Sequence, residues 1–172
     1  MVTIIVAAAR DGAIGKNGDL LWHLSGDLKR FRQLTTGQVV IMGRKTWESL
    51  PKRPLPDRLN IVITRDLSFE APGALIAHSL KEALELGKNT EGIEKEIFII
   101  GGESIYRQAL PLTDAIDFTL IDSVYPDADA RFELPDSDKW EITDEGTPLK
   151  DEKSGLTYRH QKLVRNAGRS HK

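Results

Sequence analysis

Five stretches of almost uninterrupted apolar residues, rich in β-branched side chains, constrain this fold more than any other feature. Strands with one solvated face alternate polar and apolar residues. Continuous apolar runs are instead typical of strands covered on both faces in a mainly parallel sheet. Stretches with helical periodicity separate several of the runs. The sequence therefore predicts an α/β fold with strands at residues 3–9, 39–42, 60–64, 97–100 and 115–121.

Four helices are expected between these strands. The first covers residues 24–36, with its cap near Ser25 or Gly26 and its end at Gly37. The others are a short helix after Gly43, a helix from the Ser79 cap to about Gly87 with Glu82 completing a capping box, and a helix after Gly102.

The remaining segments are expected to be a short strand at 74–77, a closing antiparallel strand pair at 140–143 and 156–164, and connections. Residues 10–19 contain three glycines and are predicted to form a long irregular connection, a type of segment that often acts as a lid. Residues 91–96 and 122–129 are predicted to be charged connections. The acids at 122–129 match no ion-binding spacing, so no metal site is predicted.

The composition is that of an ordinary globular chain and excludes several classes of protein. With 172 residues, 40% of them hydrophobic, the sequence predicts one domain at 1–165 and a basic tail at 166–172 that frays. The net charge of −2 gives no sign of a nucleic-acid partner. The absence of cysteine excludes disulfides and thiolate chemistry. Without a membrane-length apolar run or a signal-peptide pattern, we expect a cytoplasmic protein that binds no membrane. We also expect a monomer, because no long exposed apolar stripe is evident.

Asp27 occupies an unusual position on the first helix. Stepping along residues 24–36 places Leu28, Phe31 and Leu34 within an arc of about 120°, and Asp27 falls inside this apolar arc. A carboxylate that loses hydration has a raised pKa, which suits acid–base chemistry. The alternative is that Asp27 only offsets the helix dipole from the first turn. The helix alone does not decide between the two.

Glycines and cations stand where two of the predicted strands end. Gly43 precedes Arg44 and Lys45 at a helix start, where free amides and two cations suit a phosphate group; the alternative is a solvated basic turn. Gly101 and Gly102 allow a ligand to approach another helix start closely, or form a tight turn. The full Gly-x-Gly-x-x-Gly fingerprint is absent, so an ordinary Rossmann domain is not supported.

The end of the strand at 60–64 bears on which dinucleotide would bind. Ligands collect at the carboxyl ends of strands in open α/β sheets, and sites that prefer NAD commonly place an acid near the ribose. Here the candidates are Arg44, Thr64 and Arg65. These side chains favour a 2′-phosphate and therefore NADP.

Taken together, the motifs resemble those of dihydrofolate reductases of the bacterial chromosomal type, in unbroken order over nearly the whole chain. The resemblance implies a central eight-stranded, mostly parallel sheet with an antiparallel C-terminal strand and about four flanking helices. The motifs that carry it are Ile5-Val6-Ala7-Ala8, Ile14-Gly15, Trp22-x-Leu24-x-x-Asp27-Leu28-x-x-Phe31, Val40-Ile41-Met42-Gly43-Arg44-Lys45-Thr46-Trp47-Glu48-Ser49, Pro54-Leu55-Pro56-x-Arg58-x-Asn60, Ile100-Gly101-Gly102 and Tyr106.

The resemblance also implies an NADPH-dependent oxidoreductase acting on a C–N bond. It would reduce 7,8-dihydrofolate to 5,6,7,8-tetrahydrofolate by hydride transfer from nicotinamide C4 to pterin C6, with protonation at N5, and so supply folate for one-carbon metabolism. The antifolates trimethoprim and methotrexate would then compete with dihydrofolate.

The resemblance assigns the substrate side to particular residues. Asp27 would bind the pterin N3 and 2-amino group, Thr119 would hydrogen-bond that carboxylate, and Trp22 would hold an ordered water, while Leu20 belongs to the catalytic loop. Arg58 would clamp the glutamate α-carboxylate with a bidentate guanidinium. The full implied substrate set is Ile5, Val6, Ala7, Asp27, Leu28, Phe31, Leu50, Leu55, Arg58, Ile100, Tyr106 and Thr119.

On the cofactor side, the resemblance implies a 2′-phosphate held by Arg44, Thr64 and Arg65, and a cis peptide at Gly101-Gly102. His78 would touch the adenosine end. The full implied cofactor set is Ala7, Ile14, Gly15, Gly43, Arg44, Lys45, Thr46, Thr64, Arg65, His78, Ile100, Gly101, Gly102, Glu103, Ser104, Ile105 and Tyr106.

The sequence departs from the family pattern at one position, and two other functions remain as alternatives. Leu21 takes the place of the proline that usually precedes the tryptophan, which removes a φ restraint from the loop. A reductase of riboflavin synthesis shares the fold and NADPH, although Asp27 and Arg58 argue against it. A nucleotide-binding module without catalysis is the alternative from another class.

Overall fold

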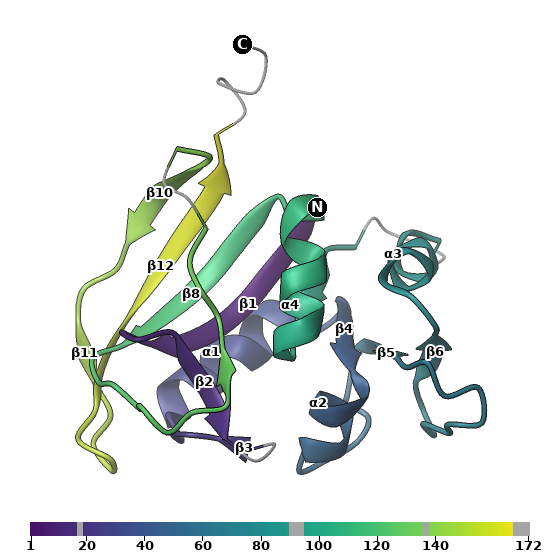
Figure 1. Ribbon diagram of the computed structural model, residues 1–172, viewed down its shortest axis with the longest axis horizontal. Helices are drawn as coiled ribbons and strands as arrows, with labels where there is room; N and C mark the ends of the chain where they lie inside the picture. Colours follow the sequence, from purple (N-terminus) through teal and green to yellow (C-terminus); the bar gives the residue numbers. More distant parts are fainter. Residues whose placement is uncertain (17–18, 90–94, 136–137, 167–172) are drawn as a thin grey trace.

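The computed structural model describes residues 1–16, 19–89, 95–135 and 138–166. Its helices lie on both faces of a twisted mixed sheet, with α1 behind the sheet and α4 in front in Figure 1. The helices are α1 (Ser25–Thr35), α2 (Arg44–Ser49), α3 (Leu80–Lys88) and α4 (Glu103–Ala109), and a 3₁₀ turn, Leu110–Leu112, follows α4.

Eight strands form the path of the main sheet in the described part of the chain, in the order β10-β12-β8-β1-β7-β4-β5-β6, and the short β11 adds to β12. All pairings from β8 to β6 are parallel, whereas β12 runs antiparallel to both β8 and β10. The predicted fold class is therefore confirmed. The strands are β1 (Val2–Ala9), β4 (Val39–Gly43), β5 (Leu59–Ile63), β6 (Leu75–Ala77), β7 (Ile97–Ile99), β8 (Ala115–Ile121), β10 (Trp140–Glu145), β11 (Leu149–Lys150) and β12 (Thr157–Arg165).

The core has one layer on each face of the sheet, because successive side chains of a strand point to opposite faces. On one face, Ile4 and its alternate neighbours along β1 pack with the apolar sides of α3 and α4. On the other face, Val40 and Met42 of β4 pack with Trp47 of α2 and, at the edge, with Ile5. This double burial explains why the strands read as continuous apolar runs.

The predicted irregular connection at 10–19 is wrong in part. Residues Ala13–Lys16 form β2 and Asp19–Leu20 form β3, and together with β9 (Ala130–Arg131) they make a small antiparallel sheet. Sequence gave no sign of this sheet because β9 follows an acidic turn and is only two residues long. The lid-like segment is therefore tied to the chain around residue 130 by strand pairing.

The predicted cap of α1 is also wrong, although the helix itself is confirmed. The helix begins at Ser25, the cap position is Leu24, and no side chain accepts the cap hydrogen bond. Leu24 is buried against Trp22 and Tyr158, so packing fixes where the helix starts. By contrast, Ser79 caps α3 as predicted, and its hydroxyl accepts a hydrogen bond from the Glu82 amide at 3.0 Å.

The remaining predictions concern the connections and the C-terminus. The connection at 91–96 falls largely outside the described residues, and so does the tail at 166–172 apart from Asn166. The closing antiparallel pair is confirmed as β10 and β12. Among the described helices, none combines the length and apolar character needed to cross a membrane.

Candidate active site

Helix α1 brings Asp27 against strand β8, as the amphipathic pattern suggested. The Thr119 hydroxyl donates a hydrogen bond of 2.8 Å to Asp27 Oδ1, and 23% of the Asp27 side chain remains exposed. Gly26 permits this close approach, because a Cβ at that position would lie 2.5 Å from the Tyr158 hydroxyl oxygen of β12. Asp27 thus lies half-buried on the sheet side of the helix and has a specific hydrogen-bond donor.

The surroundings of Asp27 raise its pKa above the ordinary value, and burial is the main cause. The hydrogen bond from Thr119, the charge of His160 when it is protonated and the charge of Arg30 oppose that shift, while Asp117 adds to it. Arg30 itself forms an ion pair of 2.6 Å with Asp117. The site therefore holds a carboxyl group that is easier to protonate than a surface aspartate, in a setting of partly compensated charge.

The predicted apolar arc of α1 is only partly covered by the rest of the described chain, since Leu34 packs against the core and Leu28 does not. Thr35 is the buried residue of this helix, whereas Leu28 is 44% exposed and Phe31 is half-buried. A hollow of about 440 Å³ lies beside Leu28 and Arg32. Leu34 of α1 packs against the same core cluster as four half-buried side chains of the sheet and neighbouring loops, Ile5, Leu50, Leu55 and Ile100.

Arg58 is presented by a loop that is held from inside. The fully buried Asn60 side chain accepts from the Leu55 amide and donates to the Leu55 and Arg58 carbonyls, at 2.9 to 3.1 Å. Arg58 donates through Nε to the Pro56 carbonyl at 2.8 Å and through Nη1 to the Thr35 hydroxyl at 3.0 Å. The guanidinium has five N–H groups, so three remain for a carboxylate.

Gly43 and the glycine pair meet at adjacent strand ends, as predicted. The Gly43 amide donates to the Gly101 carbonyl at 2.8 Å, and the peptide bond between Gly101 and Gly102 is cis, as expected. A Cβ on either glycine of the pair would lie 3.3 to 3.4 Å from the Thr46 hydroxyl, and one on Gly43 would lie 3.1 Å from Ile105. A side chain at any of these three positions would therefore press on Thr46 or Ile105, and the positive φ of Gly101 also favours glycine there.

Tyr106 of α4 links this turn to the central strand. Its buried hydroxyl donates to the Ile5 carbonyl at 2.8 Å, and burial raises its pKa above the ordinary range. The ring also meets Phe132 edge-on. Tyr106 thus joins the backbone of Ile5 to the glycine turn, and its ring packs in the same core layer as Val6.

Of the residues predicted for a 2′-phosphate, Arg44 and Thr64 both contact Asp66, so an acid accompanies the cation. The Arg44 guanidinium lies 3.4 Å from Asp66 and 3.5 Å from Glu48, and it stacks over the Phe69 ring. Thr64 is buried and its hydroxyl accepts from the Asp66 amide.

Arg65 and His78 are the other residues predicted near the 2′-phosphate and the adenosine. Arg65 is exposed, and His78 Nδ1 lies 2.9 Å from the Thr64 carbonyl. Surface ion pairs contribute little to stability, so the pairs with Glu48 and Asp66 hold Arg44 only weakly.

Helix α4 starts directly after the glycine pair. Glu103, in its first turn, accepts from the Arg131 amide at 2.8 Å and pairs with Arg107 at 3.3 Å, so its charge is partly neutralised. Ser104 and Lys45 are exposed. Ser104 and Ile105 follow Glu103 in the first turn of α4, and Lys45 follows Arg44 in the first turn of α2.

The predicted loop residues lie around the small sheet. Ile14 and Gly15 are buried in β2, where Gly15 pairs with Leu20 of β3. Trp22 is buried in a cluster with Leu24, and its ring lies 5.6 Å from that of Tyr125. The Leu20 side chain lies outside what the structure describes, so its predicted role remains a prediction.

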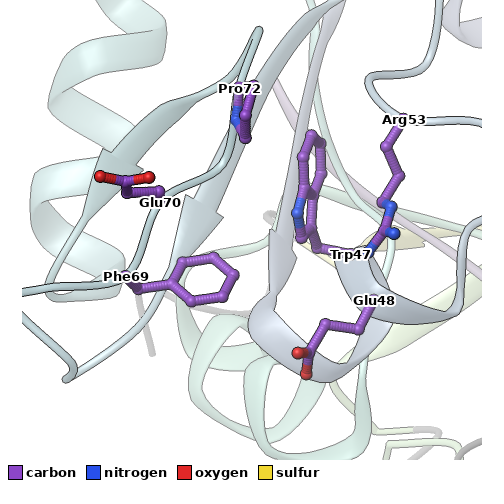
Figure 2. Close-up of a pocket in the computed structure, with 6 residues that line it drawn as sticks. All are labelled: Trp47, Glu48, Arg53, Phe69, Glu70 and Pro72. Atoms are coloured by element: carbon purple, nitrogen blue, oxygen red, sulfur yellow. The ribbon is translucent and has the colours of Figure 1, made fainter.

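A separate pocket of about 400 Å³ lies between α2 and the segment 69–72 (Figure 2). Arg53 and Trp47 form one wall, and Phe69 and Glu70 face them. None of its lining residues belongs to the predicted set. Phe69 connects it to Arg44, so it borders the cofactor residues and lies outside the Asp27 region.

Sequence reasoning missed several residues of the site. His160 hydrogen-bonds Thr119 at 2.9 Å, Thr35 holds Arg58, and Asn60 organises the loop before β5. The available signal was that Asn60 opens an apolar run, where a buried amide must find partners. His160 gave no such signal, because strand pairing alone brings it to Thr119.

Glycine turns and cations at the carboxyl ends of parallel strands, beside an acid with a raised pKa, define this chain as a nucleotide-binding α/β enzyme. A family model described as dihydrofolate reductase matches residues 1–165. The chain is 46% identical over 125 residues to the dihydrofolate reductase of Mycobacterium leprae, covering 72% of this chain and 73% of that one. It is 37% identical over 158 residues to the enzyme of Bacillus subtilis, covering 92% and 90%.

A solved structure supports the same assignment. The structure of dihydrofolate reductase from Enterococcus faecalis, complexed with NADP(H) and RAB-propyl, matches with a TM-score of 0.86 and 33% identity, covering 96% of both chains. The chain therefore belongs to the dihydrofolate reductase family of NADPH-dependent oxidoreductases. NADPH, the family's cofactor, fits the side-chain-free turn of Gly101 and Gly102 and the cations beside it.

Proposed function

We propose that this chain reduces 7,8-dihydrofolate to 5,6,7,8-tetrahydrofolate, with hydride transfer to pterin C6 and protonation at N5. NADPH supplies the hydride when bound. The observation that carries the proposal is Asp27, a half-buried carboxyl group that receives a hydrogen bond from Thr119 and has a raised pKa. Pterin N3 and the 2-amino group are donors, and a fixed carboxylate suits both.

Asp27 would act on the pterin by electrostatics and orientation. In the family's geometry this carboxylate lies too far from N5 for direct contact, so water delivers the proton. Trp22, buried near α1, would hold a water close to the carboxylate. Asp27 favours the protonated pterin because a preorganised negative charge stabilises positive charge that develops in the transition state.

The rest of the substrate would follow the uncovered side of α1. The exposed Leu28 and the half-buried Phe31 and Leu50 offer apolar contacts to the aminobenzoyl ring. Arg58 would hold the glutamate α-carboxylate through its remaining N–H groups. Ile5, Ala7, Leu55 and Ile100 would complete the walls, with Val6 and Tyr106 contributing from behind them.

NADPH would be held at the strand ends. The backbone of Gly101 and Gly102, with Thr46, would approach the pyrophosphate, and Arg44 and Arg65 would bind the 2′-phosphate. The remaining contacts would come from Ala7, Ile14, Gly15, Gly43, Lys45, Thr64, His78, Ile100, Glu103, Ser104, Ile105 and Tyr106. The 2′-phosphate would replace Asp66 and Glu48 as the ion-pair partner of Arg44.

The wider role follows from the reaction. Tetrahydrofolate carries one-carbon units, so the enzyme would supply one-carbon metabolism, and trimethoprim and methotrexate would compete with dihydrofolate. We also propose that residues 1–165 are the catalytic domain, that the enzyme is a cytoplasmic monomer, and that it has no nucleic-acid or membrane partner. Size-exclusion chromatography with light scattering tests the monomer.

Loss of absorbance at 340 nm on mixing the protein, NADPH and dihydrofolate tests the proposal. Methotrexate should abolish the change. Asp27→Asn should lose most hydride transfer at neutral pH and recover part of it in acid, whereas Asp122→Asn, which alters an exposed surface pair with Arg10, should behave as wild type. Unchanged turnover of Asp27→Asn at neutral pH would contradict the assigned role.

Two outcomes would replace the proposed function with another. Activity on a ribosylamino-pyrimidine, with none on dihydrofolate, would identify a reductase of riboflavin synthesis. NADPH binding without any absorbance change on either substrate would identify a nucleotide-binding module.

A further inference from the structure

A titratable side chain stands behind the Asp27 carboxylate. His160 on β12 is the cross-strand partner of Thr119 on β8, so both side chains point to the face that α1 covers. His160 Nδ1 lies 2.9 Å from the Thr119 hydroxyl oxygen and 3.8 Å from Asp27 Oδ1. Only 3% of Thr119 is exposed, which leaves little room for water to replace either partner of its hydroxyl.

Counting protons fixes the direction of this chain of hydrogen bonds. The Thr119 hydroxyl has one proton, and an ionised Asp27 can only accept, so the proton lies between Oγ1 and Oδ1 at the 2.8 Å contact. The hydroxyl oxygen then has only lone pairs to offer His160. The 2.9 Å contact therefore requires a proton on His160 Nδ1.

We propose that His160 is a positioning residue that donates Nδ1–H to Thr119 and thereby directs the Thr119 hydroxyl at the Asp27 carboxylate. Hydrogen bonds in such a chain polarise one another, so the donor at His160 strengthens the bond that Asp27 receives. Its loss leaves Thr119 free to rotate away, and the ionised form of Asp27 becomes less favourable.

The charged groups around His160 keep it in the neutral form that this role uses. Burial, followed by the positive charge of Arg30 on α1, lowers the His160 pKa; Asp27 and Asp117 oppose the shift. The Tyr158 ring on the same strand meets the imidazole edge-on at 5.6 Å.

The other flanking groups do not alter this balance. Lys162, the next residue on this face, pairs across the sheet with Asp117. Beyond β12, Gly146 meets His160 through its backbone, and Glu145 of β10 pairs with Arg159. At neutral pH His160 is therefore a neutral donor.

This inference depends on the proposed function for its consequence in catalysis, but its test is made on the free protein. In wild type labelled with ¹⁵N, at mildly alkaline pH, the imidazole of His160 should be the Nδ1–H tautomer with an unprotonated Nε2. A bare Nδ1 would overturn the inference. Absence of reductase activity would overturn the proposed function but would not affect the inference that His160 donates a hydrogen bond to Thr119.

Two variants provide the second measurement, a ¹³C titration of the Asp27 carboxyl group. His160→Phe keeps a ring but has no donor, and the pKa of Asp27 should rise by roughly one unit. His160→Asn places an amide donor where Nδ1 stood and should restore most of the wild-type pKa. His23→Asn, an exposed histidine, is the matched control and should change nothing.

The outcomes separate the explanations. An unchanged Asp27 pKa in His160→Phe, or equal shifts in the Phe and Asn variants, would overturn the inference, because the donor would then have no effect. If His160→Phe does not fold, the tautomer in wild type and the titration of His160→Asn decide the question.

Discussion

Arg58→Lys should weaken the binding of dihydrofolate and leave the chemical step almost unchanged. Arg58 uses Nε for Pro56 and one Nη1 proton for Thr35, and its other N–H groups form a planar fork. Lysine keeps the charge but has one compact ammonium, which cannot both hold the loop and bind a carboxylate at two points.

The size of the effect follows from the contacts that are lost. A hydrogen bond to a charged group is worth about 1.5–3 kcal/mol, and partial exposure of Arg58 places the loss near the lower part of that range, at about 2 kcal/mol. That corresponds to roughly a 30-fold increase in KM for dihydrofolate. kcat should stay within about twofold, because Arg58 does not contact the reacting atoms.

Steady-state kinetics with two substrates test the reasoning. 7,8-Dihydropteroate lacks the glutamate and keeps only its benzoate carboxylate, so Arg58→Lys should change its KM little. The two effects form a cycle that isolates the contribution of the glutamate. Arg53→Lys, the same change in the same loop at a side chain over Trp47, is the matched control. Equal weakening of both substrates would refute the carboxylate clamp and indicate that the loop is displaced.

Three further predictions follow from the packing. Gly26→Ala should destabilise the protein by about 1–3 kcal/mol in urea unfolding, and adding Tyr158→Phe should restore much of it, because the clash involves only the hydroxyl oxygen. Asn60→Ala should cost about 3 kcal/mol and raise KM for dihydrofolate, since three backbone groups lose their partner; an unchanged KM would contradict its role. The folded state raises the pKa of Asp27, so Asp27 destabilises the fold once pH rises through that value. Thermal unfolding should therefore show Asp27→Asn gaining stability relative to wild type between acid and neutral pH, and a constant difference would refute this.

The sequence by itself determined the sheet. Each inner strand is a continuous apolar run because helices or loops cover both of its faces. The need for apolar side chains on both faces is therefore visible in the sequence of each strand by itself. The glycines and cations at strand ends are local in the same sense. For this reason the parallel sheet and the strand-end grouping around Gly43 could be predicted from the residues, whereas the cis peptide at Gly101-Gly102 was expected only from the family resemblance.

The small sheet of the lid-like segment and the exposure of α1 could not be predicted from local sequence patterns. Strands β2, β3 and β9 are two to four residues long, and pairing between distant segments creates them. Leu28 fits the apolar arc, but periodicity cannot say that the rest of the described chain leaves it 44% exposed. A pattern reports which face is apolar and says nothing about what covers it.

The tertiary structure alone decided the environment of Asp27. Thr119 lies 92 residues further along the chain, and His160 follows Thr119 by another 41, so only the pairing of β8 with β12 and the docking of α1 bring them together. Desolvation and hydrogen bonding, which set the pKa of a carboxyl group, depend on these distant neighbours. The sequence placed an acid on an apolar helix face, and the fold supplied its burial, its donor and the histidine behind that donor.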